Sequence, residues 1–144
     1  MRRGLTGLAF AGCAVVALAA TYAVGARAGE RRAEARVYEL RTYTPAPGRM
    51  DALLARFRDH TTKLFDKHGI RNVGYWVTAD AKGDDQKLIY LVSHPNREDA
   101  AKDWKAFGED PEWQKARAET ERDGKLTTKV ESVYLTPTDF SKLK

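Results

Sequence analysis

Residues 36–69 carry two secondary-structure patterns in succession, and the segment reads RVYELRTYTPAPGRMDALLARFRDHTTKLFDKHG. Residues 36–44 alternate as a β-strand does, and Pro45 and Pro47 end the pattern. After Gly48 a stripe of mainly apolar residues recurs at helical spacing, and Gly69 stands where glycine commonly ends a helix. The stripe consists of Met50, Leu53, Leu54, Phe57, Thr61, Leu64 and Phe65, with Arg56 outside it. The segment therefore predicts a strand followed by an amphipathic helix.

The chain after Gly69 repeats these signals in a different order. Segments 72–78 and 87–94 are rich in aromatic and branched residues and flank a polar turn, which predicts a hairpin. Asn96 is placed to cap a second helix, which we expect to break at Gly108 and to restart at Asp110-Pro111. That helix is predicted to run to about residue 122, and residues 127–136 supply a fourth strand.

The order of elements is β-α-β-β-α-β, which predicts an α+β domain of the ferredoxin-like type. Helices on one face of a four-stranded sheet leave the opposite face uncovered, and an uncovered face must be buried against something. We expect a second copy of the chain to cover it, giving a homodimer packed sheet against sheet.

The net charge of +5 is unevenly distributed over the 144 residues. Residues 1–36 hold six arginines and two glutamates, a charge of +4, and residues 37–144 hold 19 Lys and Arg against 18 Asp and Glu, a charge of +1. A nearly neutral domain lacks the clustered positive charge that nucleic acid binding needs, so we expect no nucleic acid partner.

The N-terminus has the composition of an export signal or a membrane anchor. Arg2 and Arg3 precede an uncharged run over residues 5–24, long enough for a bilayer-spanning helix, and Ala26-Arg27-Ala28 resembles a cleavage site. Both interpretations stay open: cleavage after Ala28, or a retained anchor. We accordingly divide the chain into a signal peptide or anchor (1–28), a linker (29–35) and a domain (36–144). Either interpretation places the domain outside the cytoplasm (periplasmic or secreted) or on a membrane, which it contacts only through the N-terminal segment.

Strand alternation suggests which side chains meet on one face of the sheet. Because Tyr38, Leu40 and Thr42 form the more apolar set of the first strand, we expect that set to meet the helices. The other set would then face the dimer partner. The hypothesis is a partly polar pocket there, with His60 close enough to look into it, lined by Glu39, Arg41, Tyr43, Trp76, Tyr90 and His94.

The same residues have a purely structural interpretation. Glu39 and Arg41, two positions apart, can form a same-face ion pair, because buried charges persist when they are paired. His94 at a strand end suits a rim or capping role, and His68 suits the end of the first helix. No catalytic residue is assigned.

No metal or cofactor is expected. The single cysteine, Cys13, lies in the N-terminal apolar run, and three scattered histidines give no ligand spacing. The domain also lacks a glycine-rich phosphate loop and a nucleophile motif.

Four pieces of the domain together resemble the NIPSNAP family. They are Val37-Tyr38-Glu39-Leu40-Arg41-Thr42-Tyr43, Pro47-Gly48, Gly74-Tyr75-Trp76 and Asp110-Pro111-Glu112-Trp113, and the resemblance covers about residues 36–140. It implies a dimeric α/β barrel in which two ferredoxin-like sheets pack face to face.

Two functions are compatible with that resemblance. One is a non-catalytic homodimer that binds a small hydrophobic molecule or a partner. The alternative, by analogy with the wider superfamily, is a cofactor-free enzyme of monooxygenase or isomerase type that uses the barrel cavity.

Overall fold

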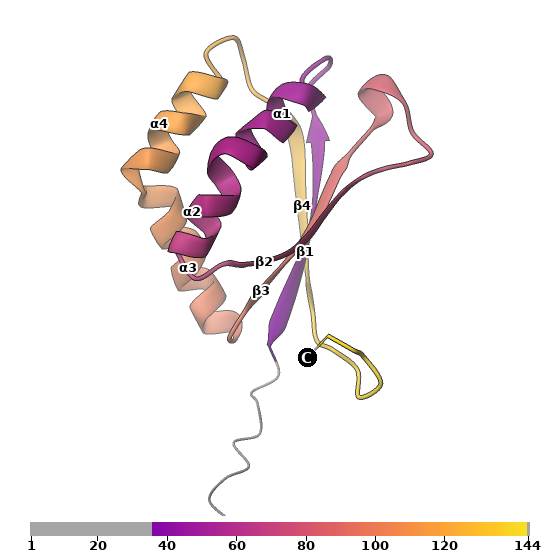
Figure 1. Ribbon diagram of the computed structural model, residues 1–144, viewed down its shortest axis with the longest axis vertical. Helices are drawn as coiled ribbons and strands as arrows, with labels where there is room; N and C mark the ends of the chain where they lie inside the picture. The colour runs from indigo at the N-terminus through magenta and orange to yellow at the C-terminus, as the bar shows by residue number, and fades with distance from the viewer. Residues whose placement is uncertain (1–35, 144) are drawn as a thin grey trace, which may run out of the picture. The chain divides into compact units, whose positions relative to one another are not determined.

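The computed structural model describes residues 36–143, which belong to one compact unit spanning residues 34–144 (Figure 1). The predicted signal or anchor, the linker and the cleavage site lie outside the described residues. Within residues 36–143, no helix is long and apolar enough to cross a membrane. The elements are β1 (Val37–Pro45), α1 (Met50–Arg56), the π-helical turn η1 (Phe57–Thr61), α2 (Thr62–Lys67), β2 (Arg71–Val77), the 3-10 turn η2 (Gly83–Asp85), β3 (Leu88–His94), α3 (Arg97–Glu109), α4 (Pro111–Thr120) and β4 (Thr127–Leu135).

The sheet confirms the predicted topology. Its strand order is β2-β3-β1-β4, and each hydrogen-bonded pair of strands is antiparallel. The helices α1 to α4 all cover the same face of the sheet in Figure 1. This is the ferredoxin-like arrangement, in which the other face of the sheet carries no helix.

The first helix is not uniformly α-helical. Between α1 and α2 the chain widens into the π-helical turn η1, closed by a hydrogen bond from the Thr62 N–H to the Phe57 carbonyl. The Thr61 hydroxyl donates to the Arg56 carbonyl at 3.2 Å, also across five residues. Such turns accommodate an extra residue and occur frequently at functional sites.

The second helical region breaks at Asp110, and the predicted break at Gly108 is wrong. Helix α3 runs through Gly108 to Glu109, because an interior glycine weakens a helix by only about 1 kcal/mol. Pro111 disfavours the helical conformation at the preceding residue, and Asp110 is extended there. Its carboxylate then caps α4 by accepting from the Glu112 N–H at 2.7 Å.

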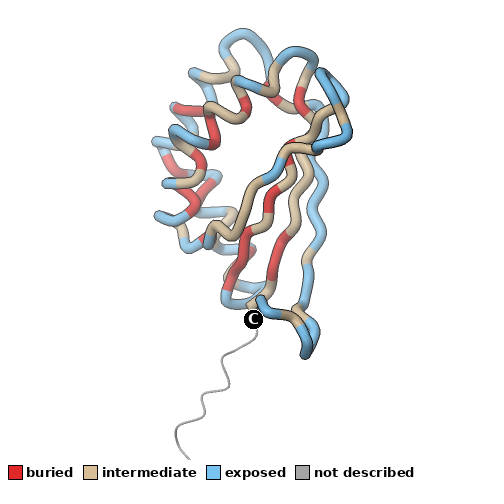
Figure 2. The backbone as a smooth tube through the Cα atoms, turned by 45° about the vertical axis from the view of Figure 1, so that its right-hand side comes forward, coloured by how far each residue is buried: buried red, intermediate tan, exposed pale blue. Residues whose placement is uncertain are grey.

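The hydrophobic core lies between the helices and the sheet (Figure 2). Tyr90 stands at its centre, fully buried, with Phe57, Phe65 and Tyr75 around its ring at centroid distances of 5.2–6.0 Å. The other completely buried apolar side chains are Leu53, Ile70, Leu88, Val92, Ala100 and Leu126. The predicted helix stripe and the hairpin strands thus form one core.

Candidate functional site

The polar side chains of β1 face the helices, so the predicted orientation of this strand is wrong. Trp104 on α3 contacts Glu39, and the Phe57 ring on η1 lies 5.8 Å from the Tyr43 ring. Tyr38, Leu40 and Thr42 lie on the face without helices. The relative hydrophobicity of the two sets of side chains gave the wrong orientation. Glu39 and Arg41 neutralise each other, and this allows the more polar set of β1 side chains to be buried.

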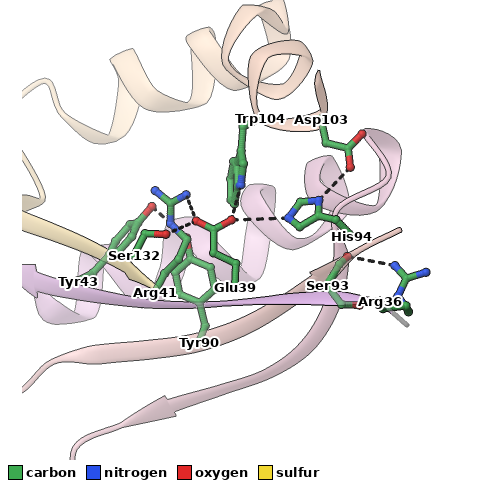
Figure 3. A network of polar contacts seen from close by, with 10 residues as sticks. All are labelled: Arg36, Glu39, Arg41, Tyr43, Tyr90, Ser93, His94, Asp103, Trp104 and Ser132. Carbon is green, nitrogen blue, oxygen red and sulfur yellow. Dashed lines mark hydrogen bonds and ion pairs between the residues drawn. The ribbon is translucent and has the colours of Figure 1, made fainter. Parts of the chain in front are cut away.

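Glu39 is the centre of a polar network beneath α3 (Figure 3). Glu39 is 1% exposed, and its carboxylate accepts hydrogen bonds from Arg41 Nη1 at 3.0 Å, Ser132 Oγ at 2.5 Å and Trp104 Nε1 at 2.6 Å. The Arg41 guanidinium also lies 4.2 Å from the Trp104 ring centroid. Each oxygen of the carboxylate is therefore occupied, and Glu39 and Arg41 form the same-face ion pair of the structural interpretation.

The surroundings of Glu39 keep it ionised. Burial alone would raise the pKa of its carboxyl, but the nearby His94 ring, the hydrogen bonds from Ser132 and Trp104, and the charge of Arg41 lower that pKa to about 2. A carboxylate held in this way stabilises the fold and is a poor proton acceptor near neutral pH.

His94 is buried within the same network, and the predicted rim position is wrong. Its Nδ1 lies 2.9 Å from Asp103 Oδ2, and its Nε2 lies 3.7 Å from Glu39 Oε2 (Figure 3). The β3 strand ends at His94 directly under α3, so the helix covers the ring. His94 thus bridges a strand carboxylate and a helix carboxylate.

Trp76 and His60 do not join these residues. Trp76 pairs with Ile89 across the hairpin and lies on the uncovered face of the sheet, 54% exposed. His60 is half-buried in η1. Thr61, one residue further, is buried. The sequence-predicted pocket is therefore not one site, although Glu39, Arg41, Tyr43, Tyr90 and His94 share a face.

A cavity of about 200 Å³ opens next to this network, between the sheet, η1 and α4. Tyr43 connects the two, because it lines the cavity and its hydroxyl accepts a hydrogen bond from Tyr90 at 3.0 Å. The lining mixes aromatic and polar side chains, and its charged residues lie at one end. It consists of Tyr43, Arg56, Phe57, Thr61, Phe65, Phe107, Trp113, Arg117, Glu121, Thr127 and Val130.

The polar end of the cavity is formed by Arg56, Arg117 and Glu121. Arg56 Nη1 donates to Glu121 Oε1 at 2.9 Å, and Arg117 Nε donates to Glu121 Oε2 at 3.2 Å. Burial raises the pKa of the Glu121 carboxyl, and the hydrogen bonds from the two arginines more than offset this and lower it. Two cations and one anion leave this end with a net charge of +1.

The sequence interpretation missed Arg56, which was placed outside the buried stripe and is 4% exposed. The available signal was its position three residues after Leu53, one of the two spacings that share a helix face. Glu121 and Arg117, four residues apart near the end of α4, gave no such signal. Within residues 36–143, no group of three or more His, Cys, Asp and Glu side chains is arranged to hold a metal ion.

Acid is expected to destabilise the domain through Glu39. Its pKa is about 2 in the folded state and near 4.5 when unfolded, so its contribution is complete above about pH 5 and disappears as the pH falls to 2. The loss should be on the order of 2 kcal/mol in the free energy of unfolding. Urea unfolding at pH 7, 4 and 3 measures it. The Glu39→Gln variant should lack this part of the pH dependence and the exposed-site control Glu98→Gln should retain it. Equal pH dependence in wild type and Glu39→Gln would contradict the assignment.

The fold and the site define a two-layer α+β domain, a sheet covered by helices on one face, with a partly polar pocket between the layers. The NIPSNAP family model matches residues 38–142, so the chain belongs to the NIPSNAP family. A comparison with curated proteins finds no match.

Solved structures show the same fold. A NIPSNAP family protein with unknown function from Agrobacterium tumefaciens is 23% identical, with 77% of this chain and 96% of that chain covered and a TM-score of 0.66. A second one from that organism is 25% identical, with 76% and 99% covered and a TM-score of 0.66. An uncharacterized NIPSNAP domain protein from Burkholderia xenovorans is 20% identical, with 73% and 97% covered and a TM-score of 0.61.

Proposed function

We propose that this NIPSNAP domain binds a small, largely apolar molecule in the cavity between its sheet and α4. The pocket itself carries the proposal, because its space of about 200 Å³ is lined by both aromatic and charged side chains. Concave sites with aromatic walls and a few convergent polar groups are typical of small-molecule binding. Such pockets usually measure ~300–1,000 Å³ for drug-sized ligands, so the molecule bound here is small, with one ring or a short chain.

Binding fits the site better than catalysis does. Among the described residues that line the cavity there is no histidine. Glu39, the best-placed carboxylate of the network, already accepts hydrogen bonds from three side chains. Glu121 is likewise held by two arginines. A general base needs a free position and a pKa near the working pH, and neither carboxylate offers both.

Filling the cavity should abolish binding. Indole and toluene, as neutral apolar probes, are expected to raise the Tm of the wild-type chain. The Val130→Trp substitution places an indole ring at the cavity wall and should weaken binding of both probes at least tenfold. Val133→Trp makes the same change on the other face of β4 and should leave probe affinity unchanged. Affinities from calorimetry decide the matter: a wild-type chain that binds neither probe, or two variants that behave alike, would exclude this cavity as the site.

We further propose that two copies of the chain associate through the uncovered sheet face. Trp76, Val133 and Leu135 are 54%, 56% and 41% exposed on that face, and the Lys129–Glu131 pair there neutralises itself. Large exposed apolar side chains grouped on one face mark interaction sites. A second copy is the partner that this surface fits, because an apolar face without net charge is complementary to itself about a two-fold axis.

Gly74 adds to the flatness of this face. A Cβ atom at Gly74 would lie 2.5 Å from Cη2 of Trp76, so the indole ring lies over the glycine and along the strand. A ring lying along the sheet in this way offers its broad side to a facing sheet, as sheet-on-sheet packing requires.

The localisation inferred from residues 1–28 stays a proposal. The charged start and the apolar run support export or anchoring, and the N-terminal residue of the protein isolated from cells distinguishes the two. A chain that begins at Gly29 is cleaved, and one that retains residues 5–24 is anchored.

A further inference from the structure

The segment that follows β4 carries the most exposed large apolar side chain among residues 36–143. Phe140 is 85% exposed and Leu143 is 48% exposed, and both belong to residues 136–143, here called the arm. Single exposed apolar residues are normal on protein surfaces, whereas several grouped together mark an interaction site. Two such side chains, three positions apart in one short segment, therefore point to a contact made by the arm.

The arm is folded although it leaves both apolar side chains in solvent. The Ser141 N–H donates to the Thr138 carbonyl at 3.1 Å, which closes a turn around Phe140. The Phe140 N–H donates to Asp139 Oδ1 at 3.1 Å. A segment that already has a shape loses less conformational entropy when it binds than a freely moving one. The arm is in this sense prepared for a partner surface.

The arm lies beside the uncovered face of the sheet. Figures 1 and 2 both show it on the side of the sheet away from the helices. It follows the edge strand β4, whose Val133 and Leu135 are exposed on that same face. The apolar surface proposed to bind a second copy thus continues directly into the arm.

The arm is long enough to reach a second copy. Two sheets that pack face to face lie about 10 Å apart. Phe140 follows the last residue of β4 by five positions, which span up to about 17 Å in an extended chain. Because sheets are twisted, two packed sheets diverge toward their corners, and the end of an edge strand is such a corner. The arm therefore stands where the gap between two sheets is widest.

A second copy offers the arm an apolar surface. One row of paired residues crosses the four strands of the uncovered face, and it consists of Gly74, Leu91, Leu40 and Val133. Leu40 and Leu91, on the two central strands, are only half-buried. The arm does not lie over this row in its own copy, because Phe140 would then be covered. The row of a second copy is left as the surface that it fits.

We propose that the arm of each copy packs Phe140 and Leu143 against the uncovered sheet face of the other copy. This inference rests on the proposed association of two copies and assigns a further contact to it. Because a two-fold axis repeats the contact, four apolar side chains leave water when the dimer forms.

Sedimentation velocity of the full chain over a concentration series measures the contribution of the arm. Phe140→Ser should raise the Kd for dimerisation at least about tenfold, because the apolar contact is lost twice. The residue is exposed, so the fold is retained and circular dichroism checks it. Lys142→Ser is the matched control in the same segment, and it should change the Kd by less than about twofold.

A photo-crosslinker identifies the copy that the arm contacts. Benzoylphenylalanine in place of Phe140 is irradiated in dimers assembled from unlabelled and isotopically labelled chains. Mass spectrometry should find crosslinked peptides that combine the two labels and join position 140 to a strand of the uncovered face. Crosslinks confined to one label would show that the arm folds back onto its own sheet, and would overturn the inference.

The affinity series separates this inference from the proposal on which it rests. A wild-type dimer with the same Kd as Phe140→Ser overturns the contact through the arm and leaves the association of the sheets intact. A wild-type chain that is monomeric at every concentration removes the proposed association itself, and this inference fails with it.

Discussion

The Glu39→Ala variant is expected to lose about 3–5 kcal/mol of unfolding free energy, the largest effect of any single change described. The substitution removes an acceptor shared by Arg41, Ser132 and Trp104. Removing one member of a buried ion pair leaves the other charge buried without compensation, and here a tryptophan N–H also loses its partner.

Urea denaturation at pH 7 measures this loss. Glu98→Ala is the matched control, because Glu98 is also a carboxylate in an ion pair, with Lys102 at 2.8 Å, but the pair is exposed and lies on α3 away from the uncovered sheet face. Its loss should be within about 1 kcal/mol. Glu39→Gln retains an acceptor for Trp104 and should fall between the two. A loss below about 1 kcal/mol in Glu39→Ala would show that the network does not stabilise the fold.

The Val133→Lys variant should be monomeric under conditions in which the wild-type chain is a dimer. Val133 pairs with Leu40 on the uncovered face. A two-fold interface places each substitution in the contact twice, so two lysines would be buried against apolar surface. A Kd for dimerisation at least 100-fold higher corresponds to about 2.7 kcal/mol.

Sedimentation velocity over a concentration series tests this expectation. Val130→Lys, at the same kind of residue on the helix-covered face of the same strand, should remain dimeric. A wild-type chain that sediments as a monomer at every concentration sinks the dimer proposal. Equal loss of association in both variants would place the interface elsewhere.

The order of strands and helices was predictable from local patterns. The two-residue period of strands and the helical spacing of apolar residues both appear within short stretches of sequence. Asn96 and Asp110 cap helices as their residue types predicted, and Gly69 ends α2 with a positive φ of 77°. These features depend on neighbouring residues only, which is why the sequence was sufficient for them.

The side of the sheet that meets the helices was not predictable in the same way. Strand alternation places Glu39, Arg41 and Tyr43 on one face of the sheet. It places Tyr38, Leu40 and Thr42 on the other, but it does not indicate which of the two faces packs against the helices. Hydrogen bonds from Trp104 and Ser132 allow the Glu39 carboxylate to be buried under the helices, and these residues lie 65 and 93 positions away along the chain. The site depends on such distant contacts, so most of the cavity residues were missed.

Because of the π-helical turn η1, inserting or deleting one residue in this helix would change which side chains line the cavity. Thr61 in this turn is buried at the cavity wall while its neighbour His60 is partly exposed, and the turn accommodates one residue beyond the α-helical count. Loss of one residue from the turn would restore the regular spacing and rotate the following side chains by about 100°. Related chains can therefore share the sheet, the helix and even the local sequence, and still line the cavity with different side chains.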